Sequence, residues 1–239
     1  MTRSPIFLPR SVFLPTFVQV EARSNREGCR LALAPSLEVE RELWALGKLR
    51  VAGVDEAGIG PLAGPVVAAA CLIPAGCGAI HGVRDSKTLS RAQRERLFAE
   101  ILRQATAVGV GVSSPREIER LNVLLASRLA MQRALWRIGG YDHALIDGRE
   151  PAGIDLGPHT AIIDGDVFSY AVACASIVAK VTRDRLMRKL AERYPGYGWE
   201  HNAGYGTVEH LKALRKLGLT PLHRRTYAPV HAVDRKSVV

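Results

Sequence analysis

The sequence predicts an α/β layered domain over residues 35–239, preceded by a disordered extension over residues 1–34. Apolar runs of strand length alternate with longer segments of helical periodicity, an order typical of a sheet covered by helices. Three of the apolar runs lead into acidic residues. The extension lacks this order, because Pro5, Pro9 and Pro15 interrupt its short apolar pieces.

The first half of the domain combines two helices with three strands. Ser36 and Ser90 are candidates for helix N-caps. The apolar run before Asp55 has strand length, and the run after the following glycine-rich turn is typical of a buried strand. Alternation of valine with glycine predicts a third strand. The expected elements are a helix at 37–46, strands at 51–54 and 65–73, a helix at 91–105 and a strand at 108–112.

The second half alternates helices with two short strands. One apolar run ends at Asp147 and another leads toward Asp166, while Gly218 follows the last helical segment as a C-terminal stop. In the helix before these strands, Met131 and Trp136 are expected in the core. The expected elements are helices at 115–121 and 123–138, strands at 144–146 and 160–163, and helices at 171–193 and 207–217.

The charge balance favours a polyanionic partner. The chain has 33 Lys and Arg against 23 Asp and Glu, which gives a formal net charge of +10. Residues 1–34 hold only five Arg and two Glu, so most of the excess lies in the domain. Such an excess favours nucleic acid, and arginine binds phosphate in a bidentate manner. The alternative is a codon usage that favours arginine without functional meaning.

Cysteine spacing and hydropathy limit the class of protein. The four cysteines form no Cys-x-x-Cys pair, which argues against a zinc site or a disulfide framework and fits a reducing cytoplasm. No apolar run reaches the ~18 residues that a membrane span requires. We therefore expect a cytoplasmic protein that does not bind membranes.

The acids at the ends of the predicted strands form a candidate metal site. Asp55 and Glu56 follow the first strand, Asp147 follows the fourth and Asp166 comes soon after the fifth. Buried carboxylates are unfavourable unless a cation or hydrogen bonds compensate them, and Mg²⁺ prefers carboxylate oxygen. Two such ions held ~4 Å apart can activate water against a phosphodiester. The alternative is that each Asp is an ordinary turn former.

The glycine-rich turn after Glu56 has two readings. Gly58 and Gly60 could begin a dinucleotide-binding fingerprint, but the third glycine, Gly64, stands one position late. Pro61 and Pro65 also interrupt the segment, and a strand rather than a helix follows. We reject the dinucleotide reading and retain a close approach of this backbone to another phosphate or sugar.

A series of motifs then indicates a family. The segment AGVDEAGIGPLAGPV, which begins at Ala52, resembles the opening motif of ribonuclease HII, the type 2 ribonuclease H. Further segments resemble that family's motifs in the same order along residues 36–230. They are DSKTLS from Asp85, LIDG from Leu145, GDVFS from Gly165, ASIVAKVTRD from Ala175, GYGT from Gly204 and HRRTY from His223.

The resemblance implies a ribonuclease-H-like fold, with a mixed central sheet flanked by helices and a helical C-terminal portion. It implies hydrolysis of RNA in RNA–DNA hybrids and cleavage on the 5′ side of ribonucleotides embedded in duplex DNA, leaving a 3′-hydroxyl and a 5′-phosphate. It assigns Asp55, Glu56, Asp147 and Asp166 as catalytic ligands of two Mg²⁺ or Mn²⁺ ions. We further expect a monomer, and we see no clear peptide for docking to a replication clamp.

The resemblance also implies contacts to nucleic acid. The family reads the ribonucleotide through a Gly-Arg-Gly backbone, here Gly58 and Gly60 around Ile59, and through a tyrosine, here Tyr205. Candidate phosphate contacts are Lys87, Lys180, Arg183, Arg224 and Arg225. The histidines His201, His210 and His223 lack metal-ligand spacing and are expected at the surface or beside phosphate.

Three departures from the family pattern bear on substrate choice. Ile59 replaces the arginine, Asp164 stands where a lysine is common, and Asn202-Ala203 replaces His-Lys. We expect Asp164 to face solvent. The loss of a charged donor at Ile59 predicts a weaker preference for a single embedded ribonucleotide. The alternative function is a non-catalytic or junction-blind nucleic-acid-binding protein of the same fold.

Overall fold

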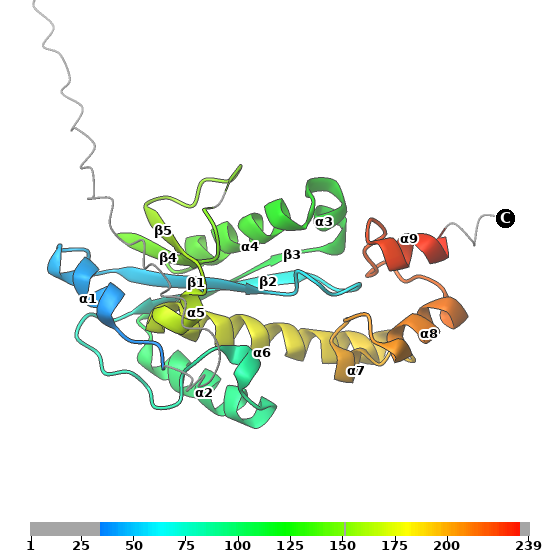
Figure 1. Cartoon of the computed structure of the whole chain (residues 1–239), viewed down its shortest axis with the longest axis horizontal. Coiled ribbons are helices and arrows are strands. Elements are labelled where there is room, and N and C mark those ends of the chain that lie inside the picture. Colours follow the sequence, from blue (N-terminus) through cyan, green and yellow to red (C-terminus); the bar gives the residue numbers. More distant parts are fainter. Residues whose placement is uncertain (1–33, 151, 235–239) are drawn as a thin grey trace, which may run out of the picture. The chain divides into compact units, whose positions relative to one another are not determined.

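A five-stranded mixed sheet forms the centre of the part of the chain that the structure describes (Figure 1). The structure is a computed structural model and describes residues 34–150 and 152–234. The predicted extension therefore lies outside the described residues, apart from residue 34. The strands are β1 (Val51–Ala57), β2 (Val66–Ile73), β3 (Ala107–Ser113), β4 (His143–Asp147) and β5 (His159–Ile162).

The strand order is β3-β2-β1-β4-β5, with β1 in the middle. β1 pairs antiparallel with β2 and parallel with β4, β2 pairs antiparallel with β3, and β4 pairs parallel with β5. All eight residues of β2 are buried, as its uninterrupted apolar run predicts. The mixed sheet expected from the sequence is confirmed.

Helices cover both faces of this sheet. The long helix α6 (Tyr170–Arg193) packs on β1 and β2 and carries α2 (Arg91–Gln104) on its outer side, with α1 (Glu38–Ala45) near β1. α4 (Val123–Arg137) covers β3 and β2 on the opposite face, next to α3 (Pro115–Leu121). Figure 1 shows α6 and α2 on one side of the sheet and α4 on the other.

Glycines in the strands let the helices approach closely. A Cβ at Gly53 in β1 would overlap the backbone of Ala171 in α6. A Cβ at Gly111 in β3 would likewise overlap the carbonyl of Ala130 in α4. The valine–glycine alternation of β3 therefore has a packing cause, since any side chain would push the helix off the sheet.

Most helix ends agree with the sequence. Ser90 caps α2 in a reciprocal capping box with Gln93. Ser36 accepts a hydrogen bond from the Glu38 amide at 3.3 Å, although Leu37 occupies the N-cap position of α1. No helix in the described ranges is long and apolar enough to cross a membrane.

Trp136 corrects the predicted core. Met131 is fully buried as expected, but Trp136 is 70% exposed. The buried positions of α4 repeat at Ala130, Met131, Ala134 and Leu135, which places residue 136 on the opposite face. The position of residue 136 on the helix, rather than its large apolar side chain, therefore determines its exposure.

The C-terminal part is helical, as expected. It contains α7 (Trp199–Asn202), α8 (Val208–Leu217) and α9 (Ala228–Asp234), and Gly218 follows α8 with a φ of 77°. The sequence did not predict α7, α9, the 3₁₀ turn η1 (Ser86–Thr88) or α5 (Gly165–Phe168). Of these, η1, α5 and α7 have only three or four residues, which is too short to show helical periodicity.

Candidate active site

Three of the four predicted acids stand on two neighbouring parallel strands. β1 continues through Asp55 and Glu56 to Ala57, so these acids lie within the strand rather than after it. Asp147 is the last residue of β4. The register sets Val54 opposite Ile146, which puts Asp55 and Asp147 at the same level of adjacent strands.

Asp166 is placed beside these acids by a short helix rather than by a strand. The prediction that a strand leads into Asp166 is wrong, because β5 ends at Ile162 and Asp166 lies in α5. The amide of Gly165 donates a hydrogen bond to Asp147 Oδ1 at 2.7 Å, which ties this short helix to the end of β4. Asp164 has a left-handed φ of 54° and is exposed, as expected.

Asp55 and Glu56 point to opposite faces of β1, as consecutive residues of a strand do. Asp55 is 5% exposed and interacts with Ser176 of α6. Glu56 feels the positive charges of Arg128 in α4 and Lys87 in η1. The acids therefore lie on both faces of the sheet, near the C-terminal ends of β1 and β4.

Burial raises the pKa of all four acids, and repulsion from neighbouring carboxylates adds to this effect. Burial, followed by the charges of Glu56 and Asp147, raises the pKa of Asp55 well above its ordinary value. Burial and Asp147 raise the pKa of Glu56 to about 7. Burial, Asp85 and Asp147 raise the pKa of Asp166 to about 6, and burial raises that of Asp147. Asp164 adds to the last effect despite its exposure.

The donor set fits a hard divalent cation. Glu56 Oε2 and Asp166 Oδ2 are buried and accept no hydrogen bond. Carboxylate oxygens are the ligands that Mg²⁺ and Mn²⁺ prefer, and buried acids without partners are stabilised by such an ion. Within the described ranges, no three His, Cys, Asp or Glu side chains already lie close enough together to hold a metal ion.

Lys87 forms an ion pair with one of the acids. Its Nζ lies 3.8 Å from Asp166 Oδ2, while the side chain stays 77% exposed. Partial burial lowers the pKa of Lys87, but the negative charges of Asp166 and its neighbours outweigh this and raise it. Asp85 supports the turn by accepting the Lys87 amide hydrogen bond at 2.8 Å. Sequence reasoning had not singled out Asp85, although it stands in the same short motif.

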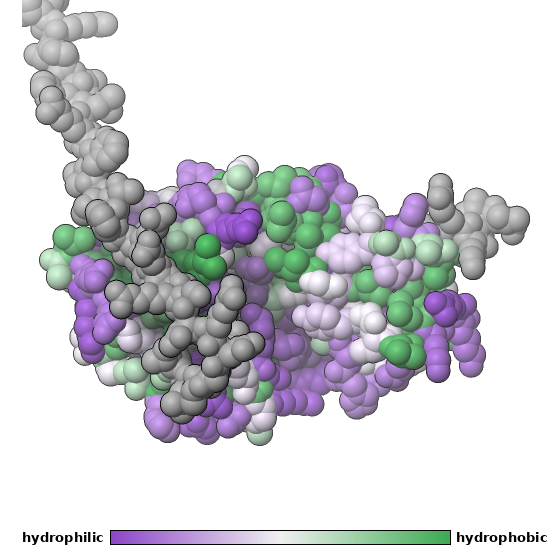
Figure 2. Space-filling model, in the orientation of Figure 1, coloured by the Kyte–Doolittle hydropathy of each residue, from purple (hydrophilic) through white to green (hydrophobic). Residues whose placement is uncertain are grey.

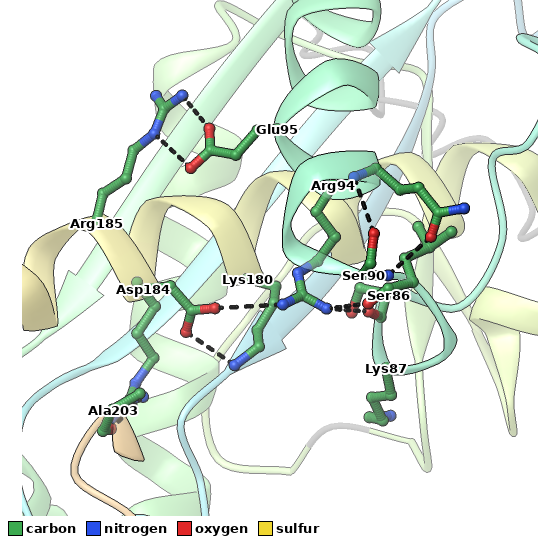
Figure 3. A network of polar contacts seen from close by, with 12 residues as sticks. Ser86, Lys87, Ser90, Arg94, Glu95, Lys180, Asp184, Arg185 and Ala203 are labelled. Atoms are coloured by element: carbon green, nitrogen blue, oxygen red, sulfur yellow. Dashed lines mark hydrogen bonds and ion pairs between the residues drawn. The ribbon is translucent and has the colours of Figure 1, made fainter. Parts of the chain in front are cut away.

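A network of ion pairs holds the turn that carries Lys87 (Figure 3). Arg94 of α2 donates to the carbonyl of Ser86 at 2.9 Å and pairs with Asp184 of α6 at 3.9 Å. Asp184 also pairs with Lys180 at 2.8 Å, so its carboxylate neutralises two basic groups. In Figure 3, Lys87 points away from this network.

A groove of about 440 Å³ joins the acids to the predicted substrate loop. Its lining includes Asp55, Glu56, Asp147, Gly58, Ile59, Gly60, Lys87, Lys180 and Tyr205. Lys180 Nζ lies 6.0 Å from the Tyr205 ring centroid, and a Cβ at Gly60 would come within 3.7 Å of that ring. One face of the molecule is hollowed and hydrophilic near its middle, with apolar side chains gathered over α3 and α4 (Figure 2).

Arg183 and Arg224 correct the predicted phosphate contacts. Their exposed fractions are 1% and 0%. Arg183 donates to the carbonyls of Ala63, Pro65 and Ala203 at 2.9 to 3.2 Å. Arg224 donates to the carbonyls of Gly58, Ile59 and Gly64 at 2.6 to 3.0 Å. Both guanidinium groups therefore hold the substrate loops from beneath and cannot reach a phosphate.

The other basic residues predicted near phosphate differ in their exposure. Lys180 is partly buried in the groove, and Arg225 is exposed while its amide donates to Glu119 at 2.9 Å. Phosphate binding by Lys87, Lys180 and Arg225 stays a prediction. His201 is exposed as expected, but the surface assignment of His210 and His223 is wrong, because both are buried.

Asn202 and Ala203 serve the fold of the Tyr205 loop. Asn202 donates to the Tyr197 carbonyl and accepts from the Gly204 amide, each at 2.8 Å. Ala203 has a left-handed φ of 48°. These two residues shape the loop rather than offer a cation to phosphate.

A second groove, which sequence reasoning missed, lies on the other side of Glu56. It has a volume of about 570 Å³ and includes Ile59, Leu124, Arg128 and Arg149. Arg128 donates to the Arg149 carbonyl at 3.3 Å and keeps the pKa of Glu56 lower than burial alone would set it. No local sequence pattern indicated this groove, because its lining residues come from segments far apart in the chain.

Comparison with known proteins gives a consistent family. A sequence model of the family described as Ribonuclease HII matches residues 52–230. A ribonuclease HII of Thermosynechococcus vestitus is 55% identical over 192 residues, which covers 80% of this chain and 90% of that protein. One of Desulfitobacterium hafniense is 50% identical over 195 residues, or 81% of this chain and 74% of that protein.

The fold is also similar to a solved structure. The crystal structure of the ribonuclease H2 from Pyrococcus horikoshii superposes with a TM-score of 0.65 at 28% sequence identity. The match covers 78% of this chain and 98% of that chain. The fold expected from the resemblance is confirmed, and none of these comparisons supports the non-catalytic alternative.

Proposed function

The chain belongs to the ribonuclease HII family, a family of metal-dependent endoribonucleases that act on RNA–DNA hybrids, and we propose that it also cuts duplex DNA on the 5′ side of an embedded ribonucleotide. The observation that carries the proposal is the gathering of Asp55, Glu56 and Asp147 with Gly58 and Tyr205 around one groove. Acids suited to metal-assisted hydrolysis thus adjoin a backbone loop suited to a sugar and phosphate.

The acids would hold Mg²⁺ or Mn²⁺. Asp55 and Asp147, on adjacent strands, and Glu56 and Asp166, with their unpartnered oxygens, offer the carboxylate donors. Two such ions, when bound, supply an activated water and neutralise charge at the scissile phosphate. Lys87, 3.8 Å from Asp166, adds a mobile positive charge where the phosphate backbone arrives.

The loops beside the acids would recognise the ribonucleotide. Gly58 has a φ of 105°, and a Cβ there would overlap the Arg183 side chain, so only glycine fits this turn. Gly60 is exposed beside the Tyr205 ring, which leaves its backbone open to a sugar. The half-exposed Tyr205 ring can pack on the neighbouring sugar. We place this activity in the cytoplasm, because the cysteine pattern fits a reducing compartment.

The test is cleavage of two end-labelled duplexes by the purified protein, in Mg²⁺ and in Mn²⁺. One duplex carries a single ribonucleotide in DNA, and the other carries a continuous RNA strand on DNA. An all-DNA duplex is the control. We expect cleavage of both ribonucleotide-containing duplexes, with the cut in the first duplex on the 5′ side of the lone ribonucleotide. The products should carry 3′-hydroxyl and 5′-phosphate ends.

Each other outcome is informative. Cleavage of the continuous hybrid alone overturns the junction proposal while it retains the role of the acids. Tight binding without cleavage of either duplex overturns the catalytic proposal and favours the nucleic-acid-binding alternative. Cleavage of the all-DNA control overturns selectivity for RNA.

A further inference from the structure

Two buried histidines lie behind the Tyr205 loop and take no part in the proposed chemistry. His210 belongs to α8, and His223 follows that helix after a short turn. Their exposed fractions are 0% and 1%. Their rings pack against Tyr197 and Trp199, with centroids 5.1 to 6.1 Å apart. Two ionisable rings in an apolar cluster need specific hydrogen bonds to be tolerated there.

The partners of each ring fix its tautomer. His223 Nδ1 faces the Thr220 amide at 2.9 Å, and an amide can only donate, so the proton of His223 sits on Nε2. His210 Nδ1 faces the Tyr205 carbonyl at 2.9 Å, and a carbonyl can only accept, so the proton of His210 sits on Nδ1.

The remaining nitrogen of His210 agrees with this assignment. His210 Nε2 faces the Trp199 indole N–H at 3.1 Å and His223 Nε2 at 3.1 Å, and both of these groups donate to it. A proton on His210 Nε2 would oppose two donors at once. Burial, which comes first among the causes, lowers the pKa of both histidines, to about 4 for His223. The pair is therefore neutral around pH 7.

This network ends at the backbone of the predicted sugar-binding residue. The Tyr205 carbonyl accepts hydrogen bonds from His210 Nδ1 and from the Thr207 amide at 2.8 Å. The other side of Tyr205 carries its ring, which is 44% exposed and lines the groove with the acids. A shift of the carbonyl would move the ring, because both belong to one short loop without regular structure.

We propose that the neutral His210–His223 pair is a positioning device that fixes the Tyr205 backbone and thereby sets how tightly the site holds the sugar beside a ribonucleotide. The inference rests on the proposed function, because it takes Tyr205 as a substrate contact. His210 and His223 touch neither substrate nor the acids. Their effect on the reaction passes through Tyr205 alone.

Two substitutions of His210 separate positioning from packing. His210→Asn keeps an N–H near the position of Nδ1, so it retains the donor to Tyr205 and loses the acceptor for Trp199 and His223. His210→Gln places its amide near Nε2, so it retains the acceptor and loses the donor to Tyr205. Each variant loses about half of the network, so we expect similar losses of Tm from both.

Their kinetics should differ. For the single-ribonucleotide duplex, we expect His210→Gln to raise KM by about five- to tenfold with little change in kcat, and His210→Asn to stay within about twofold of the wild type. His231→Gln, in the exposed α9, is the matched control and should match the wild type. Equal KM values for the Asn and Gln variants would overturn the proposal.

A double-mutant cycle with Tyr205→Ala separates this inference from the proposed function. If His210 acts through Tyr205, His210→Gln adds no further increase of KM in the Tyr205→Ala background. Additive effects overturn the positioning role and leave Tyr205 as a substrate contact. An unchanged KM in Tyr205→Ala itself overturns the proposed role of Tyr205 and the inference with it.

A measurement on the unaltered protein covers the case in which a variant does not fold. Nitrogen-15 NMR of the imidazole rings at pH 7 distinguishes a protonated Nδ1 from a protonated Nε2. We expect the Nδ1–H form for His210 and the Nε2–H form for His223. A His210 ring with its proton on Nε2 could not donate to Tyr205, and that result would overturn the proposal.

Discussion

The acid end of the sheet and the support beneath the substrate loops use charged and ionisable residues in opposite ways. At the acid end, Asp55, Glu56 and Asp147 crowd together, and burial with mutual repulsion raises their pKa values. Beneath the loops, Arg183 and Arg224 are buried more completely than these acids, yet each has several carbonyl acceptors. The first region leaves its polar groups open for a ligand, while the second satisfies them internally.

This difference shows that a buried charged residue can serve either ligand binding or the stability of the fold. An acid with an unpartnered buried oxygen, such as Glu56 or Asp166, destabilises the free protein and is suited to binding a cation. A buried arginine saturated by backbone carbonyls stabilises the loop that supplies them. The following changes test the contrast, from the largest expected effect to the smallest.

Asp147→Asn should separate chemistry from folding at the acid end. We expect turnover on either ribonucleotide-containing duplex to fall by at least about a hundredfold, because a carboxylate ligand becomes a neutral amide. Affinity for the duplex should be retained, since one negative charge near phosphate is removed. The Tm in the absence of divalent cations should be equal or higher, because repulsion is relieved.

Single-turnover kinetics, duplex binding by fluorescence anisotropy and thermal unfolding measure these three quantities. Asp164→Asn is the matched control, because Asp164 is exposed and is not one of the carboxylates that line the groove. Near-normal turnover by Asp147→Asn is incompatible with the assignment of Asp147 as a metal ligand.

Arg224→Met should show the opposite pattern. It leaves the carbonyls of Gly58, Ile59 and Gly64 without their donor, and we expect a loss of about 3 kcal/mol in the free energy of unfolding. The loop then loses its shape, so KM should rise even though every acid is intact. Chemical denaturation and steady-state kinetics measure the two effects.

Arg225→Met is the matched control for this substitution. The Arg225 side chain is exposed, and the prediction for it is a phosphate contact. We expect little change in stability and a shallower dependence of duplex binding on salt. If Arg224→Met changed only the salt dependence of duplex binding, Arg224 would contact phosphate like Arg225 and would not support the loop.

The same contrast explains what the sequence could and could not predict. Asp55 and Asp147 were predictable because an apolar run of strand length leads into each, and strand register then brings them together. Asp166 was predicted from the apolar run that leads toward it, but its helical turn was not, because α5 has only four residues. Long elements with strong apolar patterns, such as α6 and β2, were predicted nearly to their ends.

Residues beneath the loops were misassigned for a physical reason. Arg224 finds its acceptors about 160 residues away in sequence, at Gly58 and Gly64, and no local pattern signals such a bond. His210 and His223 were placed at the surface for the same reason. Residue type favours exposure for these side chains, and only the tertiary structure shows that their hydrogen bonds are satisfied inside.

The acid end should also give the metal-free protein an unusual dependence of stability on pH. Glu56 has an ordinary pKa of 4.5 and a folded-state pKa of about 7, so the folded protein binds more protons than the unfolded chain between these values. Stability is therefore fully present below about pH 4.5 and falls as pH rises to about 7. For Glu56 alone, the loss is about 3 kcal/mol.

Thermal unfolding in a chelator from pH 5 to pH 8 measures this slope. Mg²⁺ should raise the Tm more at pH 8 than at pH 5, because the ion binds the deprotonated acids. Glu56→Gln should flatten the slope. Glu117→Gln is the contrasting control, since a hydrogen bond from Arg133 lowers the pKa of Glu117 to about 2 and its stabilisation is lost only at acidic pH.

The smallest expected effect lies at the boundary between the two regions. The Ile59 carbonyl is held by Arg224 and by the Tyr227 hydroxyl, while its side chain lines both grooves beside Glu56. The backbone carbonyl of Ile59 thus belongs to the supported loop, and the residue also adjoins the groove that the acids line. Ile59→Arg changes only the side chain, and a new guanidinium there can bind phosphate.

We expect Ile59→Arg to lower KM for the single-ribonucleotide duplex by about tenfold, with a smaller gain on the continuous hybrid, because one charged hydrogen bond is added. Ile59→Gln has a long polar side chain without the charge and should give little of this gain. Competition between the two duplexes in one reaction measures the preference directly. An equal gain from Arg and Gln would show that side-chain length, rather than charge, limits recognition at this position.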